Sequence, residues 1–283
     1  MEPISFNDLK DKVCVITGGA GVIGTAIVQG LASVGIRCAI LDINQEMAEK
    51  VAGDIAKDSS AQVIGIKADV LSRESLEEAR RKVHSILGPV ELLINGAGGN
   101  SPKATTQLEK LEKKNLGELE KTFFGLNLEG FDWVFDLNFK GTLLPTMVFA
   151  QDMLYKDGGA ILNISSMNSL KPLTKIPAYS AAKASINNFT EWLSVHLAPV
   201  GIRVNAIAPG FFLTQQNRFL LVDEKTGEPT PRGEKIIANT PMARYGKTEE
   251  LQGTVLYLLS DVSQFVTGIV IPVDGGYSAF GGV

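Results

Sequence analysis

The stretch TGGAGVIG, residues 17–24, follows the apolar run KVCVI, residues 12–16. It fits two glycine patterns. Counted from Gly19 it reads GxGxxG, and counted from Thr17 it reads TGxxxGxG with Val22 at the second glycine. A strand, a glycine loop and a helix in this order typically hold the phosphates of a dinucleotide, because glycine lets the backbone approach closely and the helix start offers free N–H groups. The stretch alone does not decide between the two registers.

Apolar runs alternate with helix-length segments on the C-terminal side of this loop, a pattern typical of βαβ units. The expected strands are 13–16, 37–41, 63–67, 92–94, 160–164, 203–208 and 270–272. The expected helices are 23–34, 45–57, 72–87, 133–154, 178–197 and 249–259. The alternation predicts the α/β class, with a Rossmann-type doubly wound parallel sheet covered by helices on both faces. No linker divides the chain, so we expect a single domain over residues 1–283.

Two polar segments, 99–130 and 214–243, are longer than ordinary connections in such a fold. Both follow strand ends, where open α/β sheets bind ligands. The first carries an apolar set that would form one stripe of a helix: Leu108, Leu111, Leu119 and Phe123. Two interpretations of this segment stay open, a solvated helical excursion and a cap beside the active site.

Composition excludes several classes of function. Acidic and basic residues are interspersed and the formal net charge is −4, which argues against a nucleic-acid surface. The sequence has no apolar run long enough to span a membrane and no secretory signal pattern, so we expect a cytoplasmic protein. Cys14 and Cys38 lie in apolar runs and are expected to be buried thiols, not a disulfide or a metal pair. We expect His84 and His196 to be structural or exposed, and no metal site.

Asp42 ends the second expected strand, 18 residues after Gly24. A carboxylate there can accept hydrogen bonds from the adenosine ribose and would repel the 2′-phosphate of NADP. Residues 42–44, DIN, supply no Lys or Arg to offset that repulsion, so the sequence favours NAD. Asp69 and Val70 after the third strand are expected near the adenine. The glycine-rich turn 95–98, NGAG, is expected near the cofactor ribose.

The stretch AYSAAKASINNF, residues 178–189, predicts the chemistry. Tyr179 and Lys183 are four residues apart and share a face of a helix. Ser166 lies 13 residues before Tyr179, at the end of an apolar strand. Oxidising an alcohol requires loss of its proton as hydride leaves, yet a free tyrosine, with a pKa near ~10, is a weak base at neutral pH. A lysine ammonium and a positive nicotinamide ring favour the phenolate.

Together these motifs resemble the short-chain dehydrogenase/reductase family, in its NAD-using branch, over nearly the whole chain. The resemblance rests on Thr17-Gly18-Gly19 with Gly24, Asp69, Asn95-Gly96-Ala97-Gly98, Asn138, Ser166, Tyr179 with Lys183, and Pro209-Gly210. It implies that Tyr179 is the general acid and base, that Lys183 lowers its pKa and binds the nicotinamide ribose, and that Ser166 stabilises the substrate oxygen. It also implies a water held by Asn138 as a proton relay, a seven-stranded sheet and a homo-tetramer.

The expected cofactor-binding residues are Thr17, Gly18, Gly19, Gly21, Val22, Ile23, Gly24, Asp42, Asp69, Val70, Asn95, Gly96, Ala97, Tyr179, Lys183, Pro209, Gly210 and Thr214. Two of them depart from the family pattern. Val22 replaces the usual second glycine, and Gly96 replaces the more frequent second asparagine of NNAG. Neither departure removes a catalytic group. The downstream tyrosine and lysine favour the TGxxxGxG register for the opening loop.

A finer resemblance is to a sugar-acid branch of the family. It rests on Val22 and on GGNSPKATT at 98–106, ISSMNSLKPLTKIPAYSAAK at 164–183 and APGFFLTQQNR at 208–218. It implies reversible reduction of D-fructuronate to D-mannonate with NADH. A sugar acid needs donors for its carboxylate and hydroxyls, and the candidates are Asn100, Lys103, Asn168, Lys171, Lys175 and Arg218. Arg218, Lys103 and Asn168 are equally compatible with solvated or structural roles.

Three alternatives remain at this point. One is another polyol or sugar-acid dehydrogenase, such as a gluconate 5-dehydrogenase. The second is a 3-oxoacyl reductase, although the long polar segments favour small polar substrates over acyl chains. The third is a nucleotide-sensing protein without turnover, against which the intact set of Asn138, Ser166, Tyr179 and Lys183 argues.

Overall fold

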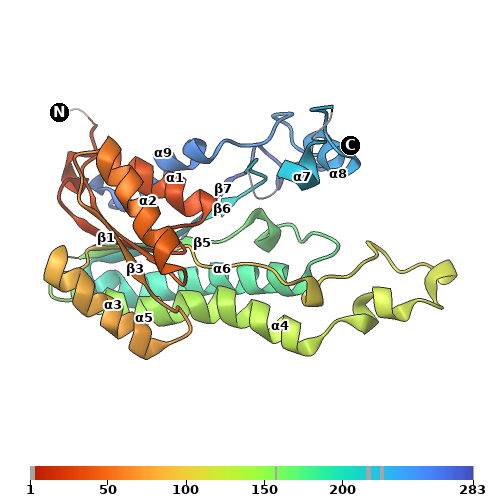
Figure 1. Cartoon of the computed structure of the whole chain (residues 1–283), viewed down its shortest axis with the longest axis horizontal. Coiled ribbons are helices and arrows are strands. Elements are labelled where there is room, and N and C mark those ends of the chain that lie inside the picture. Colours follow the sequence, from red (N-terminus) through yellow and green to blue (C-terminus); the bar gives the residue numbers. More distant parts are fainter. Residues whose placement is uncertain (1–3, 157, 215–217, 224–225, 283) are drawn as a thin grey trace.

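A parallel sheet of seven strands runs through the computed structural model, which describes residues 4–156, 158–214, 218–223 and 226–282. The strand order is β3-β2-β1-β4-β5-β6-β7, and all neighbouring strands are parallel. The strands are β1 Val13–Thr17, β2 Arg37–Asp42, β3 Val63–Lys67, β4 Leu92–Asn95, β5 Gly159–Ile164, β6 Ile202–Pro209 and β7 Val270–Val273. The predicted doubly wound α/β fold is therefore confirmed (Figure 1).

Helices cover both faces of this sheet (Figure 1). The helices are α1 Val22–Ser33, α2 Gln45–Asp58, α3 Arg73–Ile86, α4 Leu128–Phe135, α5 Gly141–Met153, α6 Pro177–Leu197, α7 Arg218–Leu221, α8 Pro231–Ala238 and α9 Gln252–Leu259. One apolar core joins the sheet to α1, α2 and α9, and a second joins it to α3, α5 and α6. Because the central strands are buried on both faces, they read as continuous apolar runs in the sequence.

The two cysteines lie next to each other in the sheet. Cys14 of β1 is in register with Cys38 of β2, and both are fully buried free thiols. Burial in apolar surroundings raises the pKa of both thiols, which keeps them in the unreactive protonated form. The expectation of two buried thiols is confirmed. In the described ranges, no helix has both the length and the apolar character needed to cross a membrane.

The expected helix 133–154 is helical as far as Met153, but helical structure begins earlier, at Leu128, and is not regular. It consists of α4 and α5 joined by a π-helical turn, Asp136–Lys140. Such wide turns inside helices are frequent at functional sites. Here the turn contains Asn138, whose side chain is completely buried and donates a hydrogen bond to the Val134 carbonyl over 2.8 Å. The apolar pattern continues across the turn, so it gave no sign of the interruption.

The first long segment forms no α-helix between residues 99 and 127, all of which the structure describes, so the interpretation as a helical excursion is wrong there. The chain makes four short 3-10 turns up to Gly125 and projects from the body of the molecule (Figure 1). Leu111, Leu119 and Phe123 are exposed and form no buried stripe. The hydroxyls of Thr106 and Thr122 bond nearby carbonyls, a local arrangement that competes with helix formation. We call residues 105–127 the arm.

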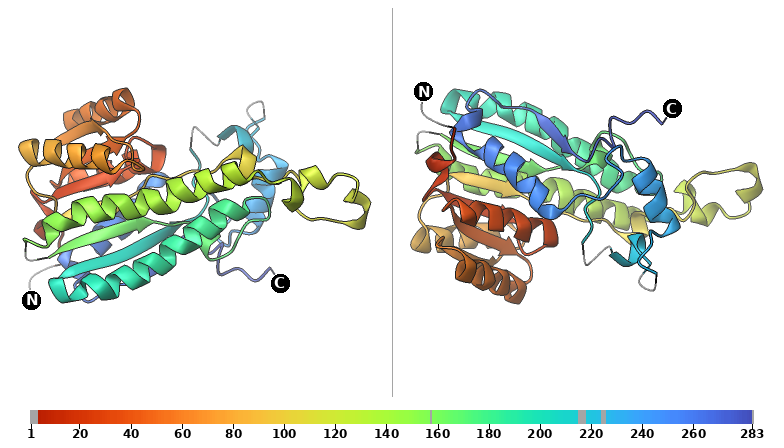
Figure 2. Two further views of the ribbon diagram at one scale, coloured as in Figure 1. Left: turned by 90° about the horizontal axis from the view of Figure 1, so that it is seen from below. Right: turned by 90° about the horizontal axis from the view of Figure 1, so that it is seen from above.

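The second long segment, 214–243, contains α7 and α8. Leu221, Val222 and Ile236 pack into a small core of their own, against Phe211 and Tyr245 among others. Residues 215–217 and 224–225 of this segment lie outside the described residues. In both views of Figure 2, α7 and α8 lie at the same end of the molecule as the arm. The segment therefore stands at the end of the sheet towards which the parallel strands run.

Candidate active site

The glycine loop between β1 and α1 is built by close backbone contacts. Gly18 has φ +65°, a conformation that favours glycine. A methyl group on Gly24 would lie 2.6 Å from the Gly18 carbonyl oxygen, so no larger residue fits there without movement. At Gly21 the nearest such contact is 3.3 Å, and Val22 is the first residue of the helix. Gly18, Gly19 and Gly24 thus have the closest contacts, while Gly21 has more space, and only Gly18 also needs a positive φ, which agrees with the TGxxxGxG register.

Helix α1 begins at this loop without a side-chain cap, since its N-cap residue is Gly21. By contrast, Asn44 caps α2 and Ser72 caps α3 through their side chains. The first-turn N–H groups of a helix have no partner within the helix, and the positive end of the helix dipole lies there. The start of α1 therefore offers donors suited to the phosphates of a dinucleotide.

A cavity of about 650 Å³ joins this loop to the carboxyl ends of the central strands. Asp42 lies at its edge, where its carboxylate also accepts a hydrogen bond from the Asn44 N–H over 3.1 Å. The cavity is lined by Ile16, Gly18, Gly21, Val22, Ile23, Gly24, Ile27, Asp42, Gly96, Ala97, Gly98, Gly99, Ile164, Ser165, Ser166, Tyr179, Lys183, Pro209, Gly210, Phe211, Phe212 and Thr214. Most of the expected cofactor residues are among them.

Five expected cofactor residues lie outside this lining: Thr17, Gly19, Asp69, Val70 and Asn95. The Thr17 hydroxyl accepts hydrogen bonds from the N–H groups of Gly96 and Ala97 and so holds the second glycine turn in place. Asn95 is buried and donates to Thr146 and Asn163. The Asp69 carboxylate accepts the Leu71 N–H within its own turn. Contacts of these residues with a cofactor stay predictions.

Tyr179, Lys183 and Ser166 converge on the cavity from two elements. Tyr179 and Lys183 are on adjacent turns of α6, and the Lys183 ammonium lies 5.7 Å from the centre of the tyrosine ring. Ser166, just after β5, hydrogen-bonds the Tyr179 hydroxyl. Lys183 is anchored by a 2.8 Å hydrogen bond to the Ile164 carbonyl. The expected hydroxyl, phenol and ammonium are thus brought together.

Asn138 reaches the same place from the π-helical turn. Its amide nitrogen donates to the carbonyls of Gly99 and Val134 over 2.7 and 2.8 Å. A methyl group on Gly98 would lie 2.6 Å from the Asn138 amide oxygen and 3.2 Å from the Lys183 ammonium. The absence of a side chain at Gly98 therefore keeps the space between Asn138 and Lys183 open.

Burial shifts the pKa values of Tyr179 and Lys183 in the directions that favour the neutral phenol and the neutral amine. Desolvation raises the pKa of Tyr179, and the hydrogen bond with Ser166 opposes this rise. Desolvation also lowers the pKa of Lys183 to about 8. The lysine ammonium can therefore lose its proton near neutral pH, which suits a group that takes part in moving a proton.

The donors expected for substrate do not line the cavity. Asn100 bonds Thr105, and Lys103 and Arg218 are exposed. Asn168 is buried two residues after Ser166, and its amide oxygen has no hydrogen-bond partner in the structure. Lys171 donates to the carbonyl of Phe280 near the chain end. Asn168 is thus the candidate that lies nearest to Ser166 along the chain.

The histidines lie away from this site. His84 contacts the buried Asp152 carboxylate together with Arg80, and His196 stacks on Trp192 with ring centres 5.0 Å apart. Both have the structural or exposed roles that the sequence predicts. Within the described ranges, no group of three or more His, Cys, Asp or Glu residues is arranged to hold a metal ion.

The geometry agrees with what comparison to known proteins finds. A family model described as short chain dehydrogenase matches residues 12–225. The chain belongs to this family. An uncharacterized oxidoreductase of Haemophilus influenzae is 50% identical over 98% of this chain and 96% of its own. The uncharacterized oxidoreductase UxuB of Bacillus subtilis is 49% identical over the full length of both chains.

One solved structure is very similar to the present chain. It is a candidate D-mannonate oxidoreductase from Haemophilus influenzae with bound NAD. The two chains are 50% identical, the TM-score is 0.92, and the match covers 98% of each chain. The present chain is accordingly an oxidoreductase of the short-chain dehydrogenase family, with the seven-stranded sheet of a Rossmann-type fold.

Sequence reasoning missed some residues of the site. Phe211 and Phe212 line the cavity, although the sequence distinguishes them only as members of the stretch APGFFLTQQNR at 208–218. Asn163, inside β5, accepts a hydrogen bond from Asn95 and donates to Thr190. A polar residue within an otherwise apolar strand was the available signal for Asn163, because buried polar groups need partners.

Proposed function

We propose that the protein is an NAD-dependent enzyme that interconverts D-fructuronate and D-mannonate. The observation that carries the proposal is the meeting of Ser166, Tyr179 and Lys183 in the cavity that the glycine loop and Asp42 also line. A ketone and a secondary alcohol differ by one hydride and one proton. The site pairs a dinucleotide cradle with a phenol positioned to move that proton.

NAD(H), when bound, supplies or accepts the hydride, and this chain's residues handle the proton. In the reducing direction the Tyr179 phenol donates its proton to the ketone oxygen as the alcohol forms. Ser166, which hydrogen-bonds Tyr179, orients that oxygen. Lys183 then returns a proton to Tyr179, and Asn138 would hold the water through which Lys183 regains a proton from solvent. Asp42 selects NAD over NADP, because its carboxylate lies on the cavity edge.

The substrate assignment has separate support. The 50% identical structure from Haemophilus influenzae is described as a candidate D-mannonate oxidoreductase. The stretches at 98–106, 164–183 and 208–218 resemble the sugar-acid branch of the family. The buried Asn168, with an unpartnered amide oxygen, is a hydroxyl-binding candidate beside Ser166.

A panel assay tests this proposal. Oxidation of NADH is followed with D-fructuronate, other hexuronates, ketogluconates and an acetoacetyl thioester, each compared with NADPH. We expect the highest kcat/KM for D-fructuronate with NADH. Brisk reduction of the thioester without turnover of fructuronate would favour a 3-oxoacyl reductase. Preference for a ketogluconate would favour a gluconate 5-dehydrogenase or related polyol enzyme. A strong preference for NADPH would overturn the role of Asp42.

We further propose a single-domain, cytoplasmic homo-tetramer. Apolar side chains on the outer faces of three neighbouring helices support assembly: Trp133 of α4 is 48% exposed, Met147 of α5 is 45% exposed and Trp192 of α6 is 58% exposed. Exposed apolar residues grouped in this way are typical of interfaces. Fractionation of cells tests the location, since recovery with the membrane fraction would contradict it.

A further inference from the structure

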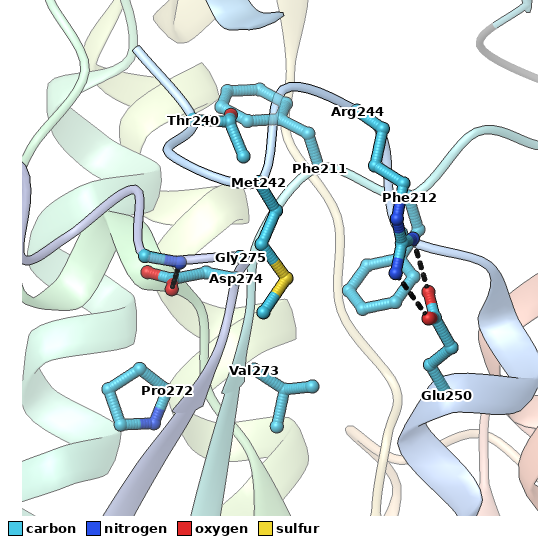
Figure 3. Close-up of a pocket in the computed structure, with 12 residues that line it drawn as sticks. Phe211, Phe212, Thr240, Met242, Arg244, Glu250, Pro272, Val273, Asp274 and Gly275 are labelled. Carbon is cyan, nitrogen blue, oxygen red and sulfur yellow. Dashed lines mark hydrogen bonds and ion pairs between the residues drawn. The ribbon is translucent and has the colours of Figure 1, made fainter.

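The chain ends in a tight turn directly after β7. The Asp274 carboxylate accepts hydrogen bonds from the N–H groups of Gly276 and Ser278 over 2.9 and 2.8 Å. Gly275 and Gly276 have φ +63° and +89°, which favour glycine. Figure 3 shows the Asp274 carboxylate turned back onto this backbone. The turn therefore fixes the direction of the next side chain, Tyr277.

Tyr277 packs against the wall of the active site that follows β6. Its ring meets Phe211 edge to face, with the ring centres 5.2 Å apart at 71°. Phe211 lines the active-site cavity, and the Gly210 N–H next to it donates to the Val273 carbonyl over 3.0 Å. Phe211 also lines a second cavity of about 370 Å³ (Figure 3). Loss of Tyr277 would remove the ring that packs against Phe211.

Tyr277 also contacts the wall that carries Ser166. The Lys171 ammonium lies 5.9 Å from the centre of the Tyr277 ring and donates a 2.6 Å hydrogen bond to the Phe280 carbonyl. The Lys171 N–H in turn donates to the Met167 carbonyl over 2.9 Å. Lys171 thus directly follows the short 3-10 turn Met167–Ser169 and its C-cap, and the N-cap of this turn is Ser166, the residue that bonds the Tyr179 hydroxyl.

We propose that the C-terminal turn, residues 274–280, is a positioning element that joins the two walls of the active site through Tyr277 and Lys171. One wall is the segment 166–171 with Ser166, and the other is the segment 209–212 with Phe211. The inference deepens the proposed function and rests on it where turnover is concerned. It also gives Lys171 a role as a tether in place of the substrate contact expected from the sequence.

The connection has a chemical consequence. Substrate must lie between Ser166 and the nicotinamide side of the cavity, so the spacing of the two walls sets the reacting geometry. Small displacements at a reacting centre reduce the rate strongly without abolishing binding. Asp42 lines the active-site cavity, whereas none of residues 274–280, all of which the structure describes, is among its lining residues. Loss of the tether should therefore lower kcat and leave the affinity for NADH nearly unchanged.

The experiment compares Tyr277→Leu, Lys171→Met and the double variant in the full chain. Tyr277→Phe keeps the ring and is expected to retain wild-type behaviour, because both contacts use the ring. Tyr155→Leu is the matched control, since Tyr155 is 88% exposed at the end of α5. Hydrogen–deuterium exchange is measured in peptides covering 164–173 and 208–214, with residues 45–58 as reference. Steady-state kinetics and the dissociation constant for NADH are measured in parallel.

We expect Tyr277→Leu to speed exchange in both wall peptides and to lower kcat about tenfold, with NADH affinity within about twofold. The double variant should lose little more than Tyr277→Leu, because both residues act through one connection. The proposal would be overturned if Tyr277→Leu left hydrogen–deuterium exchange in both wall peptides unchanged. It would also be overturned if the loss of kcat in the double variant equalled the sum of the two single losses, expressed as free energies. If the wild-type chain reduces no member of the substrate panel, the proposed function is wrong. The hydrogen–deuterium exchange data still show in that case whether Tyr277 and Lys171 connect the two walls.

Discussion

At the scale of single residues, burial decides the protonation chemistry. The sequence leads one to expect that Lys183 lowers the pKa of Tyr179. In the structure desolvation dominates both groups, raising the pKa of the phenol and lowering that of the ammonium to about 8. The Ser166 hydrogen bond is the contact that opposes the rise at Tyr179. A neutral phenol is the form needed to donate a proton to a ketone, so the arrangement suits reduction.

Replacing Tyr179 by phenylalanine should abolish turnover and spare cofactor binding. The substitution removes only the hydroxyl, and loss of a general acid costs about 10²- to 10⁴-fold in rate. We therefore expect kcat to fall by about three orders of magnitude, with an NADH dissociation constant close to that of the wild type. Fluorescence titration with NADH and a rate assay on the same preparation measure the two effects. A nucleotide sensor would bind NADH in both forms and show no turnover in either.

Lys183 predicts a dependence of stability on pH. Its pKa is about 8 in the folded chain and near 10.5 when unfolded, so the unfolded chain holds the extra proton between these values. The lysine therefore destabilises the fold fully below pH ~8, and this cost disappears as pH rises towards ~10.5. Relative to Lys183→Met, the wild type should gain about 2 kcal/mol between pH 7 and 9.5. Urea unfolding of both proteins at the two pH values measures this difference, and a constant difference would contradict the prediction.

At the scale of elements, the glycine loop depends on contact between backbone segments. An alanine at position 24 would place its methyl group 2.6 Å from the Gly18 oxygen and 2.7 Å from the Gly19 Cα. We expect Gly24→Ala to weaken NADH binding at least about tenfold and to lower the free energy of unfolding by about 1–3 kcal/mol. Gly53 in α2 is the control, because a methyl group there meets nothing within 4 Å. Gly53→Ala should stabilise the chain by about 0.5–1 kcal/mol and leave NADH binding unchanged.

The elements that the sequence predicts well are those with one dominant physical cause. The central strands are largely apolar because helices cover both faces of the parallel sheet there, and all seven expected strands are present. The arm and the π-helical turn were missed for different reasons. In the arm, threonine hydroxyls bond local carbonyls and outweigh an apolar spacing that suggested a helix. At the π-helical turn, the apolar spacing continues and only the geometry reveals the break.

Some residues of the candidate site can likewise be predicted from the sequence, and others cannot. The sequence predicts Ser166, Tyr179, Lys183 and Asp42, because each belongs to a motif with a chemical purpose, and all four line the cavity. It does not reveal the link between Lys171 and Tyr277, because that contact joins residues 106 positions apart, and the motif that contains Lys171 suggests a substrate contact instead. This contact depends on the position of β7 in the sheet, because β7 places residues 274–280 beside the segment that follows β5.

At the scale of the whole molecule, the exposed apolar side chains of α4, α5 and α6 indicate a surface that binds another protein chain. Helices α4 and α5 lie end to end, with α6 beside them, across one face (Figure 2), and the three helices carry exposed Trp133, Met147 and Trp192. Burial of such side chains against a second copy would stabilise assembly by removing apolar area from water. The arm extends beyond this face with more exposed apolar residues, among them Phe123 and Phe124. Its charges are mixed in sign, which favours contact with another copy over contact with a strongly charged partner.

The predicted tetramer can be tested by disrupting this face. Light scattering of the purified wild type should give about four times the chain mass of 30.3 kDa. Trp192→Glu places a charge on this face and should shift the population to dimers or monomers, because an unpaired charge is costly to bury. Met47→Glu is the control, since Met47 is 47% exposed on α2, on another part of the surface. Monomeric wild-type protein would contradict the assembly, and tetrameric Trp192→Glu would show that another face makes it.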